Sequence, residues 1–291
     1  MVGDGVAGLS AALTLGRARR RTLVLGAGAP RNAAAQRMHG FLSREGMPPG
    51  ELLAISRRQI EQYPDVAFAD EFVLEVERHG TGFVARAESG RTFPGKRLLL
   101  ATGVRDVLPR IEGISELWGS VLFTCPYCDG WEFRDRRLGV VGAGCEALGL
   151  AREMYRWSRD LTVIATDGSA AAEEDRAWVE LHRPTTVRTP IVRFRAVDSG
   201  AAIDFEDGTS AEFSAVFFSA PLRQRSPLPA LLGCALDAEG SVVVDDCGRT
   251  NVPGCYAAGD AANHRHQVVQ AAAGGAAAAM AINEDLIERE R

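Results

Sequence analysis

A glycine-rich turn that occurs twice limits what this chain can fold into. Residues 3–8 read Gly-Asp-Gly-Val-Ala-Gly, and residues 142–147 read Gly-Ala-Gly-Cys-Glu-Ala. Helix-forming residues follow each turn, and an apolar, strand-type segment follows each helix, at residues 21–25 and 161–165. A strand, such a turn, a helix and a second strand make the βαβ unit that binds a dinucleotide. We therefore predict an α/β fold with two Rossmann-like dinucleotide-binding domains.

Each glycine of the first turn has an expected task. Gly3 permits the tight turn, Gly5 lets a pyrophosphate approach the backbone, and Gly8 lets the helix pack closely against the strand. The free N–H groups at the start of the helix favour the phosphates. Only two residues precede this turn, where a strand of about five residues is usual. An acidic residue about 20 positions further on usually binds the ribose, but Gly26 stands there, so we expect backbone or other groups to bind it.

The second turn, with Gly142, Gly144 and Ala147, follows an intact strand-type segment at residues 137–141. Asp167 stands after its second strand, where a carboxylate suits a ribose 2′-hydroxyl and repels a 2′-phosphate. If a nicotinamide cofactor binds here, NADH is therefore favoured over NADPH. Two glycine-rich turns without a ligand are the alternative interpretation, and the strand–turn–helix context of both copies argues against it.

The segments between the turns repeat one layout, which indicates an internal duplication. In each half, alternating apolar and polar residues predict a small antiparallel meander, and an apolar strand follows it. These strands are expected at residues 72–76, 82–87 and 97–100 in the first half, and at 192–197, 202–205, 210–213 and 216–218 in the second. Short strands are also expected at residues 241–244 and 255–258, before a helix that begins near Gln267. We expect each domain to have three layers, two of β-structure and one of helices.

Cys125 and Cys128 enclose Pro126 and Tyr127 in a Cys-x-x-Cys segment. Thiols at this spacing can close a small disulfide, and one can attack a substrate disulfide as a thiolate while the other resolves the mixed disulfide. The arrangement can also lower one thiol pKa to about 7 or below. Half a zinc site is one alternative, but the other four cysteines supply no second pair, so we expect no metal. A thioredoxin-type motif is another, but a strand and the second glycine-rich turn follow this segment instead of a long helix.

Composition excludes several classes of protein. Of the 291 residues, 46% are apolar and 24% are charged, which is typical of a globular protein. The net charge of −5 gives no basic surface for nucleic acid. No segment has the roughly 20 apolar residues of a membrane helix, and no signal peptide is recognised at the start. Six cysteines are too few for a secreted disulfide framework, so we expect a cytoplasmic protein.

Together these landmarks resemble the low-molecular-weight thioredoxin reductases, which are FAD-dependent pyridine nucleotide-disulfide oxidoreductases. The resemblance covers the chain from Gly3 to about Leu286. The segments that carry it are residues 3–8, 101–103, 125–130, 142–147 and 256–260. It implies that one domain is inserted into the other. The FAD-binding domain would be discontinuous, at residues 1–112 plus 246–291, and an NAD(P)-binding-like domain with the cysteine pair would occupy residues 113–245.

The resemblance also implies tasks for individual residues. Cys128 would lie nearest the flavin, Cys125 would exchange with the substrate, and Asp129 would be the acid or base that serves the two thiols. Asp260 would bind the ribityl–phosphate region, and the helix that begins near Gln267 would direct its N-terminus at the flavin ring. The residues that would hold FAD lie at turns and helix starts: Gly3, Gly5, Gly8, Gly103, Gly259, Asp260 and Gln267. Those that would hold a nicotinamide are Gly142, Gly144, Ala147 and Asp167.

These implications predict a FAD-dependent thiol–disulfide oxidoreductase. Two electrons would pass between a nicotinamide or another donor, the flavin, the pair Cys125 and Cys128, and a disulfide substrate. The partner would be a thioredoxin-like protein or a small-molecule disulfide or dithiol. The family resemblance also implies a homodimer.

Two other functions are kept as alternatives. Related dithiol oxidases close disulfides in small natural products and pass the electrons to oxygen, which would make a nicotinamide unnecessary. Those relatives often have a histidine after the second cysteine, where this chain has Asp129. A flavin-free, catalytically silent interaction protein is the alternative of another class, suggested by the short first strand and Gly26. His264 and His266 could act as bases near the flavin, but a polar loop is the favoured interpretation.

Overall fold

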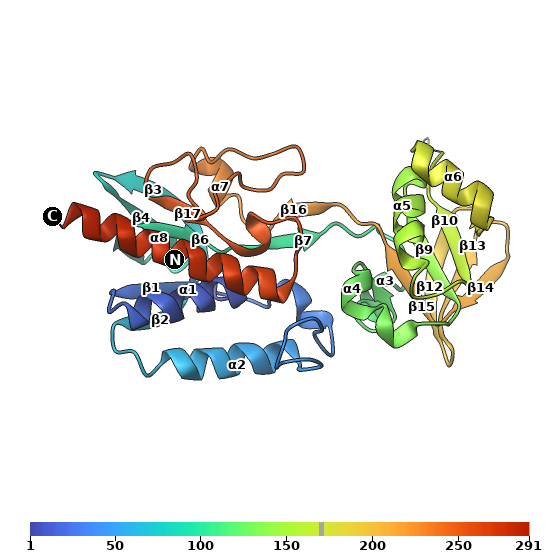
Figure 1. The fold of residues 1–291 in the computed structure, drawn as a ribbon, viewed down its shortest axis with the longest axis horizontal. Coiled ribbons are helices and arrows are strands. Elements are labelled where there is room, and N and C mark those ends of the chain that lie inside the picture. The colour runs from blue at the N-terminus through green and yellow to red at the C-terminus, as the bar shows by residue number, and fades with distance from the viewer. Residues whose placement is uncertain (169–171, 291) are drawn as a thin grey trace. The chain divides into compact units, whose positions relative to one another are not determined.

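The computed structural model describes residues 1–168 and 172–290, which fold into two compact units (Figure 1). The first unit comprises residues 1–33, residues 40–105 and the chain from residue 222 onward. The second comprises the described residues of 34–39 and 106–221. The chain leaves the first unit and returns to it, so the second unit is inserted into the first, as predicted.

The boundaries of the two units differ from those expected for the two domains. Residues 222–245, expected in the second domain, lie in the first unit because Leu228, Cys234 and Val242 are buried in its core. Residues 34–39, expected in the first domain, pack with the second unit. Which unit binds which cofactor stays a prediction.

A parallel sheet forms the centre of the first unit. Its strands are β1 (Thr22–Gly26), β2 (Val66–Asp70), β6 (Leu98–Leu100) and β17 (Cys255–Ala257). β1 pairs with β2, and β6 pairs with β17. Val2 bridges β1 and β6: its N–H donates to Leu99 at 2.9 Å, and the N–H of Leu25 donates to Met1 at 2.9 Å. The two residues before the first turn thus take the place of the expected central strand.

Three long helices belong to the first unit. They are α1 (Val6–Arg17), α2 (Pro49–Ile60) and α8 (Val268–Arg289). α1 packs side by side with α8 and also contacts α2. Small residues allow this close packing, because Ala7, Ala11 and Ala278 are buried together and a Cβ on Gly275 would collide with the carbonyl oxygen of Ala7. α8 begins directly after Gln267, as predicted.

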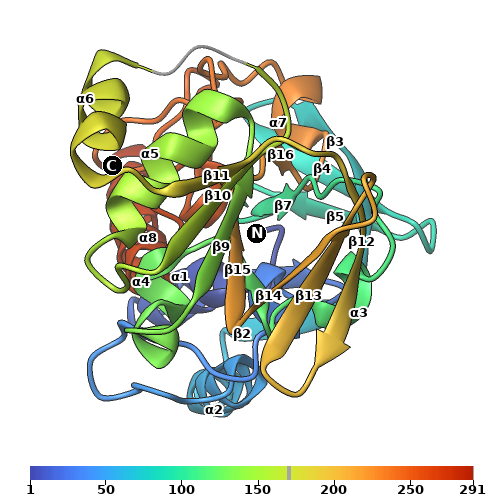
Figure 2. The same ribbon diagram turned by 90° about the vertical axis from the view of Figure 1, so that its right-hand side faces the viewer.

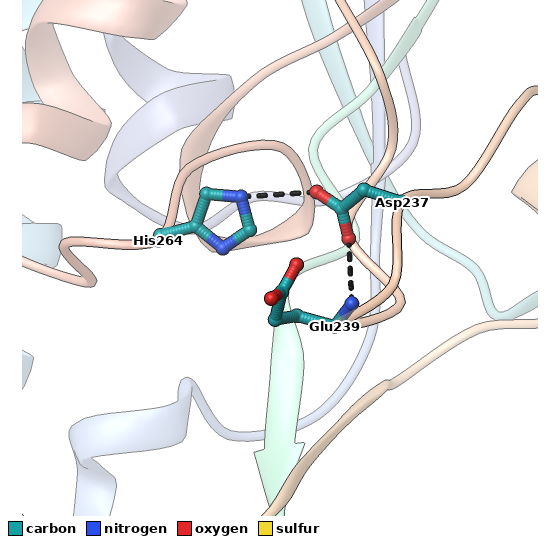
Figure 3. A group of neighbouring side chains, drawn as sticks. All are labelled: Asp237, Glu239 and His264. Carbon is teal, nitrogen blue, oxygen red and sulfur yellow. Dashed lines mark hydrogen bonds and ion pairs between the residues drawn. The ribbon is translucent and has the colours of Figure 1, made fainter. Parts of the chain in front are cut away.

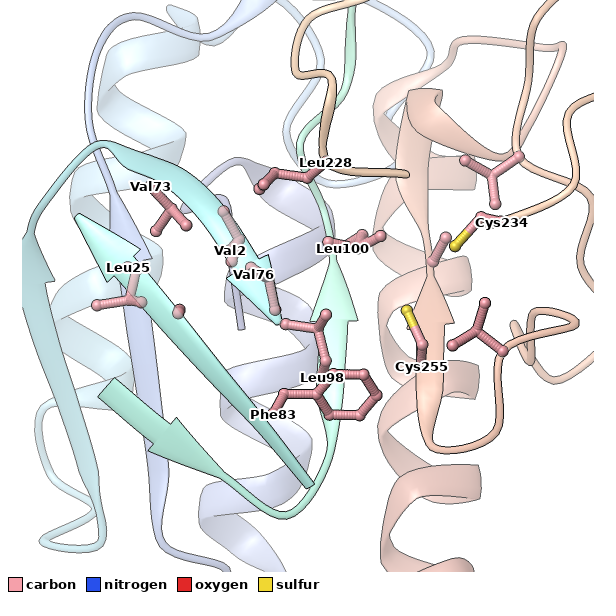
Figure 4. Packing of buried hydrophobic residues seen from close by; sticks show 14 residues of the cluster. Val2, Leu25, Val73, Val76, Phe83, Leu98, Leu100, Leu228, Cys234 and Cys255 are labelled. Carbon is pink, nitrogen blue, oxygen red and sulfur yellow. The ribbon is translucent and has the colours of Figure 1, made fainter. Parts of the chain in front are cut away.

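An antiparallel meander and several short elements complete the first unit. The meander strands are β3 (Val73–His79), β4 (Gly82–Ala87) and β5 (Thr92–Gly95). The short elements are η1 (Arg31–Ala34), β7 (Val104–Asp106), β16 (Leu222–Gln224), α7 (Leu228–Leu231) and η3 (Gly259–Ala261). The meander contributes Val73, Val76 and Phe83 to a core that also contains Cys234 and Cys255 (Figure 4).

The strand expected at residues 241–244 is wrong. That segment has a single β-bridge, between Leu236 and Val242. The Asp237 carboxylate accepts hydrogen bonds from the backbone N–H groups of Glu239 at 3.1 Å and Ser241 at 2.9 Å. The second bond takes a donor that a strand ladder would need, and residues 238–239 form a turn instead, so residues 241–244 contain no strand.

The second unit is built on a five-stranded parallel sheet (Figure 2). Its strands, in spatial order, are β11 (Thr185–Val187), β10 (Leu161–Ala165), β9 (Leu138–Gly142), β15 (Ala215–Phe218) and β8 (Leu122–Phe123). The other long elements are the helices α5 (Gly144–Met154) and α6 (Glu173–His182) and the meander β12 (Ile191–Val197), β13 (Gly200–Phe205) and β14 (Ser210–Phe213).

Side chains of this sheet alternate between two cores. Leu138 and Val140 of β9 pack in the core that contains α5 and α6. Val141, the next residue, packs in a core that contains Phe194 and Ile203 of the meander. Because side chains alternate along a strand, one face of the sheet is covered by helices and the other by the meander. The three layers agree with the predicted fold class.

Three short helical segments lie near the cysteine pair in the sequence. They are α3 (Ile114–Leu117), α4 (Pro126–Asp129) and η2 (Trp131–Phe133). Within residues 1–168 and 172–290, no helix has both the length and the apolar character needed to cross a membrane.

Candidate functional site

Cys125 and Cys128 form a disulfide at the start of α4 in the second unit. Cys125 is the N-cap residue with an extended backbone, and Pro126 occupies the first helical position. Proline suits that position because its fixed φ is helical and it needs no hydrogen-bond acceptor there. The Cα atoms of the two cysteines are 5.2 Å apart, which a disulfide can span. The local sequence thus builds the turn that brings the two thiols together.

Two exposed aromatic side chains lie close to the disulfide in the sequence. Tyr127, between the two cysteines, is 67% exposed, and Trp131, three residues beyond, is 64% exposed. The Tyr127 ring packs edge-on against Trp157, with 5.3 Å between ring centroids. The Arg134 guanidinium lies 4.0 Å from the Trp131 ring centroid. Exposed aromatic groups of this kind are typical of a surface that a partner or substrate contacts, and the sequence analysis gave them no role.

Asp129 follows Cys128, and its N–H donates to the carbonyl oxygen of Cys125 at 3.2 Å. Burial raises the pKa of its carboxyl from 3.8 to about 7, and Glu132 raises it as well, whereas the positive charge of His39 opposes the shift. His39 Nε2 lies 3.7 Å from Glu132 Oε1. A carboxyl group with such a pKa can take up and release a proton near neutral pH, which is what a general acid or base requires.

The sequence assigned no role to His39. It lies in residues 34–39, which are far from the cysteine pair in the sequence but pack in the second unit. The same short segment approaches Gly119, whose φ is +75° and where a Cβ would lie 2.9 Å from the Ala34 side chain. No local sequence signal links residue 39 to residue 129, because only the tertiary fold places them together.

The first glycine-rich turn has the shape that a dinucleotide needs. A Cβ on Gly3 would collide with the carbonyl oxygen of Ala101, and a Cβ on Gly8 would collide with that of Gly3. A Cβ on Gly5 would meet nothing within 4 Å. Gly5 is also the N-cap of α1, and no side chain caps this helix. Two glycines therefore permit close packing, and the third leaves open space before uncapped N–H groups that suit a phosphate.

Further groups lie at the carboxyl ends of β6 and β17 in the same unit. The Thr102 hydroxyl is buried without a hydrogen-bond partner among the described residues, and Gly103 has a φ of +67°. A buried hydroxyl of this kind is usually paired, so it is available to a ligand. Arg31 lies 3.4 Å from Asp260, an ion pair that the sequence analysis did not expect. Gln267 caps α8, and its carbonyl oxygen accepts the N–H of Ala271 at 2.9 Å.

Two carboxylates lie at the second glycine-rich turn. The N–H of Gly144 donates to Asp167 Oδ1 at 2.8 Å. Ser219 Oγ donates to Glu146 Oε2 at 3.2 Å, and Ala147 is fully buried. The Gly144 N–H is one of the donors that a pyrophosphate would use at the start of α5. The Asp167 carboxylate therefore accepts a hydrogen bond from the second glycine-rich turn, and a phosphate bound at that turn would lie beside a negative charge.

Asp237, Glu239 and His264 gather in one place in the first unit (Figure 3). His264 Nε2 lies 2.9 Å from Asp237 Oδ2, while the other carboxylate oxygen of Asp237 accepts the bonds of its own turn. Glu239 and His264 are exposed. This ion pair joins two loops of the first unit, which agrees with the interpretation of His264 as part of a polar loop.

Cys234 and Cys255 lie apart from the disulfide, in the core of the first unit (Figure 4). A hydrogen bond with Cys234 and burial both raise the pKa of the Cys255 thiol far above its usual range. A thiol that stays protonated is a poor nucleophile, which applies to Cys255, whereas the hydrogen bond with Cys255 lowers the pKa of the Cys234 thiol to about 7.

Comparison with known proteins connects this geometry to a family. The family model described as pyridine nucleotide-disulphide oxidoreductase matches residues 1–276. Thioredoxin reductase tcpT from Claviceps purpurea is 32% identical over 274 residues, which cover 89% of this chain and 85% of that protein.

Two solved structures are similar over almost the whole chain. An oxidoreductase from Agrobacterium tumefaciens is 34% identical, with a TM-score of 0.91 and coverage of 98% of this chain and 97% of that one. A putative thioredoxin reductase, TrxB, from Bacillus anthracis is 29% identical, with a TM-score of 0.93 and coverage of 100% and 98%.

Proposed function

The chain belongs to the pyridine nucleotide-disulphide oxidoreductase family and is a thioredoxin reductase-like oxidoreductase, and from this premise we propose what its residues do. The family implies FAD and a pyridine nucleotide as cofactors. We propose that two electrons pass between a nicotinamide or another donor and a disulfide substrate through Cys125 and Cys128. The observation that carries the proposal is the closed disulfide beside a carboxyl group whose pKa is about 7.

The first unit would hold FAD. The open space before α1, the buried Thr102 hydroxyl and the ion pair of Arg31 with Asp260 support this assignment. Gly3, Gly5, Gly8, Gly103, Gly259, Asp260 and Gln267 are the residues that would line the site. Bound FAD, once reduced by a nicotinamide or another donor, would supply the two electrons that open the disulfide.

In the proposed exchange, the reduced pair acts on a substrate disulfide. The Cys125 thiolate attacks one substrate sulfur, so that a mixed disulfide forms, the substrate S–S bond breaks and one substrate thiolate leaves. The Cys128 thiolate then attacks the Cys125 sulfur, which closes the protein disulfide and releases the second substrate thiolate. Asp129 gives a proton to a leaving sulfur, which a carboxyl with a pKa of about 7 can do near neutral pH.

The partner would be a thioredoxin-like protein or a small-molecule disulfide. The exposed rings of Tyr127 and Trp131 support an encounter at this surface, because each offers a large apolar contact beside the disulfide. A homodimer stays a prediction from the family resemblance, and a cytoplasmic location stays a prediction from the composition.

An anaerobic titration tests the proposal. NADH and then NADPH are added to the purified protein with bound FAD, and the visible absorbance of the flavin is followed. We expect bleaching, with NADH favoured, because Asp167 would repel a 2′-phosphate. A colourless protein that takes up no added FAD would favour the flavin-free interaction protein instead.

A first substitution tests the cysteine pair. Cys128→Ser should abolish disulfide turnover, because one thiol remains and no internal disulfide can close. Turnover is measured as the reduction of a disulfide reagent in the presence of an electron donor. Cys247→Ser is the control, since Cys247 lies outside the disulfide and this variant should keep native turnover. Native turnover in Cys128→Ser would contradict the assignment.

An oxygen-dependent dithiol oxidase is the second candidate function. The bond from the Gly144 N–H to Asp167 favours it, because this carboxylate takes a donor that a nicotinamide dinucleotide would use. Such an enzyme would show no bleaching with NADH or NADPH but would be bleached by a dithiol, and oxygen would then restore the absorbance. The same titration therefore separates the two functions.

A further inference from the structure

Asp4 occupies the place of the side chain that Gly26 lacks. Gly26 ends β1, and Asp4 follows Gly3 in the first glycine-rich turn. A Cβ on Gly26 would lie 2.5 Å from the Cβ of Asp4 and even closer to the Asp4 carboxylate. Only one of the two positions can therefore carry a side chain into this space.

Backbone pairing explains why the two positions coincide. Val2 runs parallel to β1, and the N–H of Gly3 donates to the carbonyl oxygen of Leu25 at 2.7 Å. Gly26 follows Leu25 at the end of β1, and Asp4 follows Gly3 in the turn that leads into α1. The carboxyl ends of parallel strands meet at one edge of the sheet, which is where such folds bind ligands. A carboxylate at residue 4 therefore reaches the region that one at residue 26 would reach.

The carboxylate of Asp4 is available to a ligand. No hydrogen bond or ion pair engages it within the described part of the chain. Other acidic groups near Gly26 differ: Asp70, its neighbour on β2, lies 3.4 Å from Arg57, and Glu71 lies 3.0 Å from Arg91. Asp4 is thus the unpaired acidic group at this position.

We propose that Asp4 accepts hydrogen bonds from the hydroxyl groups of the adenosine ribose when the first unit binds its dinucleotide. The acidic residue that usually does this ends the second strand of the βαβ unit, where this chain has Gly26. This inference rests on the proposed function, because it requires FAD in the first unit.

Ligand discrimination tests the inference without measuring turnover. Apoprotein is titrated with FAD and with an FAD analogue whose adenosine ribose lacks both hydroxyl groups, and flavin fluorescence reports binding. The native chain should prefer FAD roughly ten- to hundredfold, because the analogue makes no hydrogen bonds to the carboxylate. In Asp4→Asn, the affinity for FAD should fall by a similar factor, and the ratio of the affinities for FAD and for the analogue should decrease. Asp70→Asn is the control and should keep the native preference.

An exchange variant tests whether the two positions are equivalent. Asp4→Gly combined with Gly26→Asp should recover the preference for FAD, whereas Gly26→Asp alone should weaken binding because two carboxylates compete for one space. Thermal melting confirms that each variant is folded. A folded exchange variant without the preference would overturn the equivalence of the two positions.

The outcomes separate this inference from the proposed function. A native chain that binds FAD but does not distinguish the analogue, or an Asp4→Asn variant with the native preference, would overturn the role of Asp4 and leave the proposed function standing. A native chain without affinity for FAD would overturn both.

Discussion

Asp129 shows how burial changes the chemistry of a single residue. Its pKa rises from 3.8 to about 7, chiefly because burial disfavours the charged form. Between about pH 4 and pH 7 the folded state therefore binds a proton that the unfolded chain has lost. Over that range the stability of the native state falls as the pH rises, and above pH 7 the cost of the buried charge is fully present.

Asp129→Asn should remove this pH dependence. We expect the variant to gain stability over the native chain as the pH is raised from 5 to 8, by up to roughly 3 kcal/mol, because about two pKa units separate pH 5 from the pKa of Asp129 and one unit corresponds to about 1.4 kcal/mol. Denaturant unfolding of both proteins at the two pH values measures the difference. Disulfide turnover should fall by about 10² to 10⁴, as expected for loss of a general acid. A pH-independent stability difference would contradict the raised pKa.

His39 and Glu132 act on Asp129 in opposite directions, which allows a paired test. His39→Gln removes a positive charge that lowers the pKa of Asp129, so the ionisation of this carboxyl should move to higher pH. Glu132→Gln removes a negative charge that raises it, so the ionisation should move to lower pH. The pH profile of thiol–disulfide exchange measures both shifts. If both substitutions moved the pH profile in the same direction, a change of structure and not of charge would be the cause.

At the scale of elements, the packing of α8 on α1 depends on individual glycines. Gly274 and Gly275 are neighbours in α8 but face different surroundings. A Cβ on Gly275 would collide with the backbone of Ala7, whereas the nearest atom to a Cβ on Gly274 is 3.7 Å away. The collision at Gly275 would require the two helices to separate, whereas the contact at Gly274 is an ordinary van der Waals contact.

This difference predicts opposite effects for two alanine substitutions. Gly275→Ala should destabilise the protein by about 1–3 kcal/mol, because overpacking displaces α8 from α1. Gly274→Ala should leave stability unchanged or raise it by up to about 1 kcal/mol, because alanine favours a helix interior over glycine. Thermal unfolding of the two variants beside the native chain measures both values. Equal effects would contradict the close approach of the two helices at Gly275.

At the scale of the whole molecule, the two units have separate hydrophobic cores. One core of the first unit joins the parallel sheet to the meander and includes Leu100 and Leu228. The cores of the second unit lie on the two faces of its own sheet and include Val140 and Val216. Separate cores can lose their structure at different temperatures.

Calorimetry should therefore resolve two unfolding transitions. Excess FAD should raise the midpoint temperature of the first unit's transition only, because a ligand stabilises the unit that binds it. At a concentration 100 times the Kd, this stabilisation is about 2.7 kcal/mol. Reduction of the Cys125–Cys128 disulfide should change only the other transition. A single transition that FAD shifts as a whole would contradict independent units.

Several features could be predicted because they depend on neighbours in the sequence. The two glycine-rich turns, the meander strands and the start of α8 follow from local patterns of glycine, apolar and polar residues. The disulfide of Cys125 and Cys128 belongs here as well, since a spacing of three residues and the helical turn at Pro126 bring the thiols together. The strand expected at residues 241–244 failed because the Asp237 carboxylate bonds to the backbone of its own turn.

The sequence by itself thus determined the α/β class and the disulfide of Cys125 and Cys128, since each follows from the order and spacing of residues along the chain. The insertion of one unit into the other was implied by the family resemblance of the sequence. Only the tertiary structure brought His39 to Asp129, the Asp4 carboxylate to Gly26, and Val2 between β1 and β6. These contacts join residues far apart in the sequence or on different strands. These contacts bury side chains, bring charges close together and let one side chain exclude another. Such effects exist only once the chain has folded.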